Sequence, residues 1–300
     1  TVADDGGSSG RLRQELGIVP PGDLRSCLVA LADTEPLMEK LFQYRFSGDG
    51  DLTGHSFGNL FIAAMTQVVG GDIEQALQES SKVLAVRGQV LPASAKPVRI
   101  SAQMTDGTVI DGESNIPSAR KCIQRVTMEP AAVPAVQAAL TAIRDADIVV
   151  LGPGSLYTSV IPNLLVKDIA EALRNTRASR VYVCNVMTQP GETDQYTASD
   201  HVRALLRHGG PGIIDEVLVN VEEIASCLLE NYAKEGACPV EADIAELERM
   251  GVTVIPAQMI SETNWVRHDP ERLAKLVFSI LDRRRKASGK SGTQKNDSEE

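Results

Sequence analysis

The feature that most constrains the fold is a series of short apolar runs in the C-terminal half, each followed by a polar loop and a helical pattern. These runs occupy residues 148–151, 181–187, 217–220 and 252–255. Strands that are apolar on both faces are typical of a parallel sheet covered on both sides. We therefore predict an α/β fold, a Rossmann-like parallel sheet with helices on both faces.

The N-terminal half departs from this regular pattern, which predicts an insert over about residues 20–130. In its first part, apolar residues recur at helical spacing. Around Asp106-Gly107, apolar and polar residues alternate, which is typical of a β-hairpin. We expect one Rossmann-like domain over residues 1–285, with this helical and β-hairpin insert. The polar segment 286–300 is predicted to be a disordered tail.

Composition and charge exclude several classes of function. The formal net charge is −10 and aromatic residues make up 4% of the chain, which disfavours a nucleic-acid partner. The five cysteines form no CxxC pair, so neither a disulfide framework nor a zinc site is indicated. We find no signal peptide and no apolar run of transmembrane length. We expect a cytoplasmic protein without membrane insertion.

The stretch ADDGGSSG places two carboxylates before a glycine- and serine-rich turn and a helix. Here Gly6, Gly7 and Ser8 can present backbone N–H groups that attract phosphate. Asp4 and Asp5 would repel phosphate unless Mg²⁺ bridges them, because Mg²⁺ commonly uses carboxylates together with phosphate oxygens. The alternative is a solvated turn in which the aspartates cap the helix.

Two further polar loops follow predicted strands. GPGSLYTSVIPN offers glycines and hydroxyl groups, and NVMTQPGETD is long and polar for a loop between a strand and a helix. Ligands of open α/β sheets bind beyond the carboxyl ends of the strands, so we expect ligand contacts in both loops. For the first loop, a tight strand-to-helix turn is the alternative. The candidate residues are Gly152, Gly154, Ser155, Asn185, Thr188, Gln189 and Asp194.

The stretch GHSFG matches the G-x-S-x-G pattern of serine hydrolases, in which Ser56 would be the nucleophile. That pattern requires a buried strand directly before it, and a polar loop stands there instead. Hydrolysis by Ser56 is therefore only a third hypothesis. His55 and Asn59 are candidate ligand contacts, because they lie about one turn apart at the start of a predicted helix.

Several long stretches together resemble the gluconeogenesis factor family, the YvcK-like group related to CofD. They are TVADDGGSSGRLRQELGIVPPGDLR, GHSFGNLFIAAM, VLPAS, LGPGSLYTSVIPNLLV, NVMTQPGETDQYTASDH and VRHD. The resemblance covers residues 1 to about 281 and implies a Rossmann-like fold with a helical insert. It also implies a bacterial cytoplasmic protein that binds UDP-N-acetylglucosamine. Such a protein would support cell shape and peptidoglycan supply during growth on gluconeogenic carbon sources.

The resemblance also assigns roles to residues. It matches Asp4 and Asp5 to an acidic pair where metal and phosphate meet in the CofD branch. Tyr232 and Arg267 match positions that look like sugar-nucleotide contacts. The residues of the two polar loops match the family's second glycine turn (Gly152, Gly154 and Ser155) and its third loop (Asn185, Thr188, Gln189 and Asp194). The family normally begins with an upstream strand and a GGGTG-type loop, so we expect an N-terminally truncated chain. Some members carry a phosphorylatable threonine after VRHD, where this sequence has Pro270.

Two functions stay open at this point. One is a nucleotide-sugar-binding regulatory protein. The other is a CofD-type transferase that uses Mg²⁺ and moves a phospho-acyl group from a nucleotide donor to an acceptor alcohol. Few aromatic residues are present to stack on a flat tricyclic acceptor, which favours the binding protein over an enzyme. The sequence allows regulatory protein partners and a homodimer.

Overall fold

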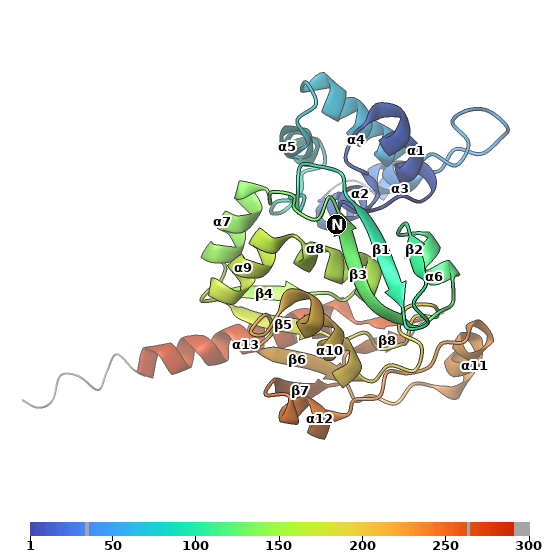
Figure 1. Ribbon diagram of the computed structural model, residues 1–300. Helices are drawn as coiled ribbons and strands as arrows, with labels where there is room; N and C mark the ends of the chain where they lie inside the picture. The colour runs from blue at the N-terminus through green and yellow to red at the C-terminus, as the bar shows by residue number, and fades with distance from the viewer. Residues whose placement is uncertain (34–35, 263–264, 291–300) are drawn as a thin grey trace, which may run out of the picture.

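A four-stranded parallel sheet lies at the centre of the computed structural model, which describes residues 1–33, 36–262 and 265–290 (Figure 1). All its neighbouring strands are parallel, so the predicted sheet is confirmed. The predicted run 181–187 is a strand only as far as Val183. The strands, in spatial order, are β4 (Ile148–Leu151), β5 (Ser179–Val183), β6 (Glu216–Asn220) and β7 (Thr253–Ala257).

Helices cover both faces of this sheet, as predicted from the apolar runs. In β6, Val217 and Val219 belong to the large core, whereas Leu218 belongs to a second cluster with Ile280 of α13. Alternate residues of one strand are therefore buried on opposite faces. The helices of this half are α7 (Gln137–Asp145), the π-helical turn η1 (Leu156–Val160), α8 (Ile161–Leu165), α9 (Lys167–Asn175), α10 (Ala198–Gly209), α11 (Ser226–Glu235), α12 (Ile244–Arg249) and α13 (Pro270–Lys290).

The insert contains helices followed by an antiparallel sheet, which lies between those helices and the parallel sheet in Figure 1. Ile100, Ala102 and Met104 are fully buried on alternate positions of one strand, which confirms the predicted hairpin and its alternation. A third strand completes the sheet, in the order β2-β1-β3. Helix α1 (Gly7–Leu16) precedes the insert, whose elements are α2 (Gly22–Leu31), α3 (Pro36–Gln43), α4 (Phe57–Val68), α5 (Ile73–Val83), β1 (Arg99–Met104), β2 (Val109–Asp111), α6 (Asn115–Ser118) and β3 (Ile123–Glu129).

A small antiparallel pair, β8 (Ile260–Glu262) with β9 (Val266–His268), precedes the last helix. Helix α13 extends to Lys290, so residues 286–290 are helical where a disordered tail was predicted. The rest of that predicted tail, residues 291–300, lies outside the described residues. Among the described helices, none is long and apolar enough to cross a membrane.

Candidate functional site

Three polar loops carry most of the predicted site residues. We call residues 4–9 the first loop, residues 152–159 the second loop and residues 185–194 the third loop. The second and third follow the carboxyl ends of the neighbouring strands β4 and β5. Their place at one edge of the parallel sheet agrees with the rule for ligand sites in such folds.

The second and third loops are fastened to each other by Asn185. Its Oδ1 accepts a hydrogen bond from the backbone N–H of Gly154 at 3.3 Å, and its Nδ2 donates to the Gly154 carbonyl at 2.9 Å. Both ends of the amide are therefore engaged by protein backbone. Asn185 therefore positions the second loop, and its predicted ligand contact stays a prediction.

Glu192, which was not among the predicted ligand contacts, makes the strongest connection between these loops. Its Oε2 accepts from the N–H of Tyr157 at 3.0 Å and its Oε1 accepts from the Thr158 hydroxyl at 2.7 Å. Gln189 donates to the same Oε1 at 3.0 Å. The Glu192 side chain is only 2% exposed, and burial raises its pKa. An acidic residue in a polar loop gives no sequence signal that it will be buried.

The other predicted residues of these loops divide into structural and free groups. Thr188 is buried and accepts from the N–H of Cys238 at 2.9 Å. Asp194 accepts from the N–H of Gly191 at 2.7 Å. Gly152 has φ of 75°, a backbone conformation that favours glycine. In contrast, the half-buried Ser155 hydroxyl has no partner within the described residues.

The first loop joins the insert through Asp5. This carboxylate accepts hydrogen bonds from the N–H groups of Glu113 and Ser114, both at 3.0 Å, and from the Ser114 hydroxyl at 2.9 Å. Asp4 accepts from the N–H of Gly6 at 3.0 Å. Neither aspartate caps α1, whose N-cap position is Gly6 without a side-chain cap, so the helix-cap alternative was wrong.

The arrangement of Asp4 and Asp5 does not fit a preformed Mg²⁺ site. The two carboxylates accept hydrogen bonds from different backbone segments, and both oxygens of Asp5 are engaged. Within residues 1–33, 36–262 and 265–290, no group of three or more His, Cys, Asp or Glu side chains could hold a metal ion.

His55 and Asn59 stand behind the first turn of α1. His55 Nδ1 lies 3.0 Å from the Ser8 hydroxyl, and Asn59 Nδ2 donates to the Ser9 hydroxyl at 3.3 Å. All four side chains are buried, and burial together with nearby Arg11 lowers the pKa of His55. His55 and Asn59 thus position the glycine- and serine-rich turn, whereas the sequence predicted direct ligand contacts.

Ser56 has a structural role that argues against the serine hydrolase hypothesis. It is fully buried and its hydroxyl accepts from the N–H of Asn59 at 3.2 Å, as the N-cap of α4. Two histidines that could supply a base are engaged elsewhere: His201 pairs through Nδ1 with the Thr197 carbonyl, and His268 donates to the Cys184 carbonyl. A buried capping hydroxyl cannot reach a substrate, so the structure does not support this function.

Glu113 is a site residue that sequence reasoning missed. It lies in the turn held by Asp5, where burial, followed by the negative charges of Asp4 and Asp23, raises its pKa to about 7. Glu192 of the third loop also contributes to this rise. The insert turn therefore carries a carboxyl group that can hold a proton at neutral pH, next to the first and third loops.

The third loop also contacts the insert directly. A Cβ atom at Gly191, where φ is 84°, would collide with the carbonyl of Pro117 in α6. The absence of a side chain at this position allows the loop to approach the insert closely. The first loop, the insert turn at Glu113 and Ser114, and the third loop therefore meet in one region.

Arg267 lies in β9 of the small β8–β9 pair, and Tyr232 lies in α11, the helix that packs on this pair. The Tyr232 hydroxyl donates to the carbonyl of Val266 and accepts from its N–H, both at 3.1 Å. His268 donates to the carbonyl of Cys184 at 3.1 Å, which holds β9 at the end of β5. Arg267 itself is exposed, and its guanidinium has no hydrogen-bond or ion-pair partner within the described ranges.

Comparison with known proteins agrees with this architecture. The family described as 2-phospho-L-lactate transferase CofD matches residues 1–260. The "Gluconeogenesis factor" of Bacillus subtilis (strain 168) is 53% identical over 282 residues, which cover 94% of this chain and 89% of that protein. A "Putative gluconeogenesis factor" of Nostoc sp. is 53% identical over 281 residues, but the chain spans only 61% of its length.

A solved structure shows the same fold. The crystal structure of a UPF0052 family member from Bacillus halodurans matches with a TM-score of 0.89 and 51% sequence identity, covering 92% of this chain and 89% of that one. Sequence identity of this level extends over nearly the whole length, including the insert and the three loops. The chain therefore belongs to the CofD family, within its gluconeogenesis factor group.

Proposed function

We propose that this protein is a cytoplasmic regulatory protein that binds the nucleotide sugar UDP-N-acetylglucosamine. In this proposal it supports cell shape, peptidoglycan supply and growth on gluconeogenic carbon sources. The observation that carries the proposal is the meeting of three polar loops that are fixed in place by buried side chains yet keep unused hydrogen-bonding groups. The name of the Bacillus subtilis relative, "Gluconeogenesis factor", supports the metabolic setting.

The first turn of α1 suits the diphosphate of such a ligand. The N–H groups of Gly7, Ser8 and Ser9 lie in that turn and have no intrahelical acceptor. A helix start of this kind attracts phosphate, because its N–H groups and its dipole both favour negative charge. His55 and Asn59 hold the two serines from behind, so the turn is organised before any ligand arrives.

Three groups nearby suit the remainder of the ligand. The free Ser155 hydroxyl can bond a ribose or sugar hydroxyl, and the exposed Arg267 guanidinium can bind phosphate or a carbonyl. Glu113, with a pKa near 7, is partly protonated at neutral pH. In that form it can donate a hydrogen bond to a ligand oxygen, and it adds less repulsion to a diphosphate than an ionised carboxylate would.

Calorimetric titration with UDP-N-acetylglucosamine tests the proposal. We expect Arg267→Ala to lower the affinity about tenfold, the usual effect of removing one charge-assisted hydrogen bond. The melting temperature should stay unchanged, since Arg267 is exposed and unpartnered. Arg144→Ala, which removes an exposed arginine on α7, is the control. Equal affinity in wild type and Arg267→Ala would refute this role of Arg267.

One finding favours a second candidate, a CofD-type transferase: the matched family is described as 2-phospho-L-lactate transferase. A transferase of that type would bind its own nucleotide donor. Titrations with GDP, UDP and UDP-N-acetylglucosamine separate the two functions. Binding of the UDP-sugar supports the regulatory protein, whereas binding of GDP alone supports the transferase.

A further inference from the structure

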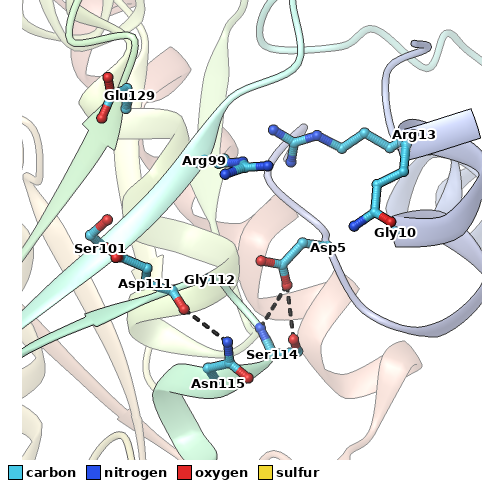
Figure 2. A pocket seen from close by; sticks show the side chains of 11 residues that line it. Asp5, Gly10, Arg13, Arg99, Ser101, Asp111, Gly112, Ser114, Asn115 and Glu129 are labelled. Carbon is cyan, nitrogen blue, oxygen red and sulfur yellow. Dashed lines mark hydrogen bonds between the residues drawn. The ribbon is translucent and has the colours of Figure 1, made fainter.

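A pocket with a volume of about 410 Å³ lies between α1 and the antiparallel sheet of the insert (Figure 2). Its walls come from α1, from strands β1, β2 and β3, and from the turn before α6. The volume falls in the range of small-molecule sites. The pocket shares Asp5 with the first loop, but none of its other walls belongs to the second or third loop.

Two arginines dominate this pocket. Arg13 of α1 and Arg99 of β1 extend toward each other across it in Figure 2. Neither guanidinium makes an ion pair or a hydrogen bond anywhere in the described ranges, and Nη1 of Arg13 is buried without a partner. The pKa of Arg13 is lowered, first by burial and then by the charge of Arg99, while the nearby charges of Asp5 and Asp4 raise it in part. Two cations held together without an acceptor form a place that an anion would complete.

The carboxylates of the pocket do not supply that anion. Asp5 is turned toward the backbone of the α6 turn and accepts its hydrogen bonds there. Glu129 is the register partner of Arg99 in the β1–β3 ladder, yet the two side chains form no ion pair. The carboxylates of Asp111 and Glu129 have no partner among the residues described. They remain available as acceptors for hydroxyl groups.

The pocket thus offers two free guanidinium groups and two free carboxylates, and these groups define which ligand it can bind. A pair of guanidinium groups with free N–H donors suits the oxygens of a phosphate monoester, which each fork can bind in bidentate fashion. Free carboxylates suit hydroxyl donors but would repel a second anionic group. The ligand should therefore be anionic at one end and hydroxylated at the other.

We propose that this pocket binds a small hydroxylated phosphate monoester, with Arg13 and Arg99 on the phosphate and Asp111 and Glu129 on the hydroxyl groups. The site is additional to the nucleotide-sugar site at the edge of the parallel sheet. Because Asp5 belongs to both regions, a ligand here contacts the same loop that begins the first turn of α1.

Titration calorimetry with three probes tests the proposal: glucose 6-phosphate, inorganic phosphate and glucose. We expect glucose 6-phosphate to bind the wild-type chain and to bind it at least tenfold more tightly than either of the other two probes. Arg99→Ala should reduce the affinity for glucose 6-phosphate at least tenfold. This variant should keep the fold, because Arg99 is exposed and its side chain has no partner to lose. Arg144→Ala serves as the control and should bind like wild type.

Arg13→Lys is the second variant, because it keeps the charge but loses the fork of donors; it should reduce the affinity several-fold. Three results would overturn the site: no binding of glucose 6-phosphate, equal binding by inorganic phosphate, or unchanged binding by Arg99→Ala. UDP-N-acetylglucosamine added to the complex separates the two sites. Simultaneous binding supports an additional site, and displacement overturns it. Binding of glucose 6-phosphate without any binding of the UDP-sugar would refute only the proposed function.

Discussion

The two sides of the candidate site differ in how completely their polar groups are paired. On the sheet side, Asn185 and Glu192 use both ends of their side chains to tie the second and third loops together. On the insert side, Arg13 Nη1, Arg25 Nε and Asn59 Oδ1 are buried without partners, which makes three of the four such atoms found among the described residues. The fourth belongs to His201, in α10.

This difference shows on which side the buried polar groups are already hydrogen-bonded and on which side they can still bond a ligand. Most buried polar groups in proteins are hydrogen-bonded, so a local group of unpaired ones has a cause. On the sheet side, the side chains that link the second and third loops are paired and form a rigid support, while Ser155 and Arg267 remain free for a ligand. The insert side, around α1, keeps hydrogen-bonding capacity that a bound molecule or ordered water can use. Four variants, measured in three experiments, test this difference between the two sides.

The largest effect is expected for Glu192→Ala. The substitution leaves the N–H of Tyr157 and the hydroxyl of Thr158 without their acceptor in a buried place. We expect the free energy of unfolding to fall by about 3 to 4 kcal/mol, as for other broken buried networks. Urea denaturation followed by circular dichroism measures it, with the exposed Glu230→Ala on α11 as control. A loss as small as that of the control would show that the sheet side is not held by this carboxylate.

The second effect concerns pH and Glu113. Its pKa is about 7 in the folded chain against 4.5 for an ordinary glutamate. Because the folded state then binds its proton more tightly than the unfolded state, Glu113 lowers stability progressively as the pH rises from about 4.5 to 7. Glu113→Gln removes this loss. We expect it to exceed wild type in stability by on the order of 2 kcal/mol at pH 8 and to match it near pH 4.5.

Urea denaturation of wild type and Glu113→Gln at several pH values checks the direction of this pH dependence. Glu230→Gln removes an exposed carboxylate that lies far from Glu113 in the sequence. Its free energy of unfolding should change with pH in parallel with that of wild type. If Glu113→Gln also ran parallel to wild type, the negative charges of the first loop and the insert turn would not be coupled. Glu113 would then not be the source of a pH-dependent loss of stability on the insert side.

The smallest effect comes from a matched pair of asparagines. Asn185→Leu should cost about 2 kcal/mol, since it leaves both backbone groups of Gly154 unpaired. Asn59→Leu should cost less than about 1 kcal/mol, because the lost bond to Ser9 is offset by removal of a buried oxygen that has no partner. Thermal and urea denaturation of the two variants gives the difference directly. Equal losses would contradict the contrast between the two sides.

Much of the architecture could be predicted from local pattern. The apolar runs predict the four strands of the parallel sheet, because burial on both faces leaves no polar position in a strand. Asp106-Gly107 predicts the turn of the β1–β2 hairpin, and the spacing of Thr197 and Asp200 is that of the capping box which they form at the start of α10. The β8–β9 pair was not predicted, since three-residue strands carry too little pattern.

The roles of the site residues were harder to predict. Sequence reasoning treated Asn185, His55 and Asn59 as ligand contacts, but their side chains support the loops from behind. Glu113 was missed, and Glu192 was not chosen among the polar residues of its loop, because a carboxyl group in a polar segment is usually solvated. Whether such a group is buried depends on segments distant in the chain, here the first loop for Glu113 and the second loop for Glu192.

The amino-acid sequence is sufficient to predict the class of fold, the insert and the family, because each rests on patterns within a few neighbouring residues or on long matching stretches. It also determined that ADDGGSSG would lie at a helix start. Contacts between distant segments make Asp5 accept hydrogen bonds from the turn at Glu113 and Ser114, and they place Arg13 and Arg99 in one pocket where neither guanidinium is paired with a carboxylate of the described residues. The physical reason is that pairing of charges and hydrogen bonds depends on distances between segments, which local sequence does not specify.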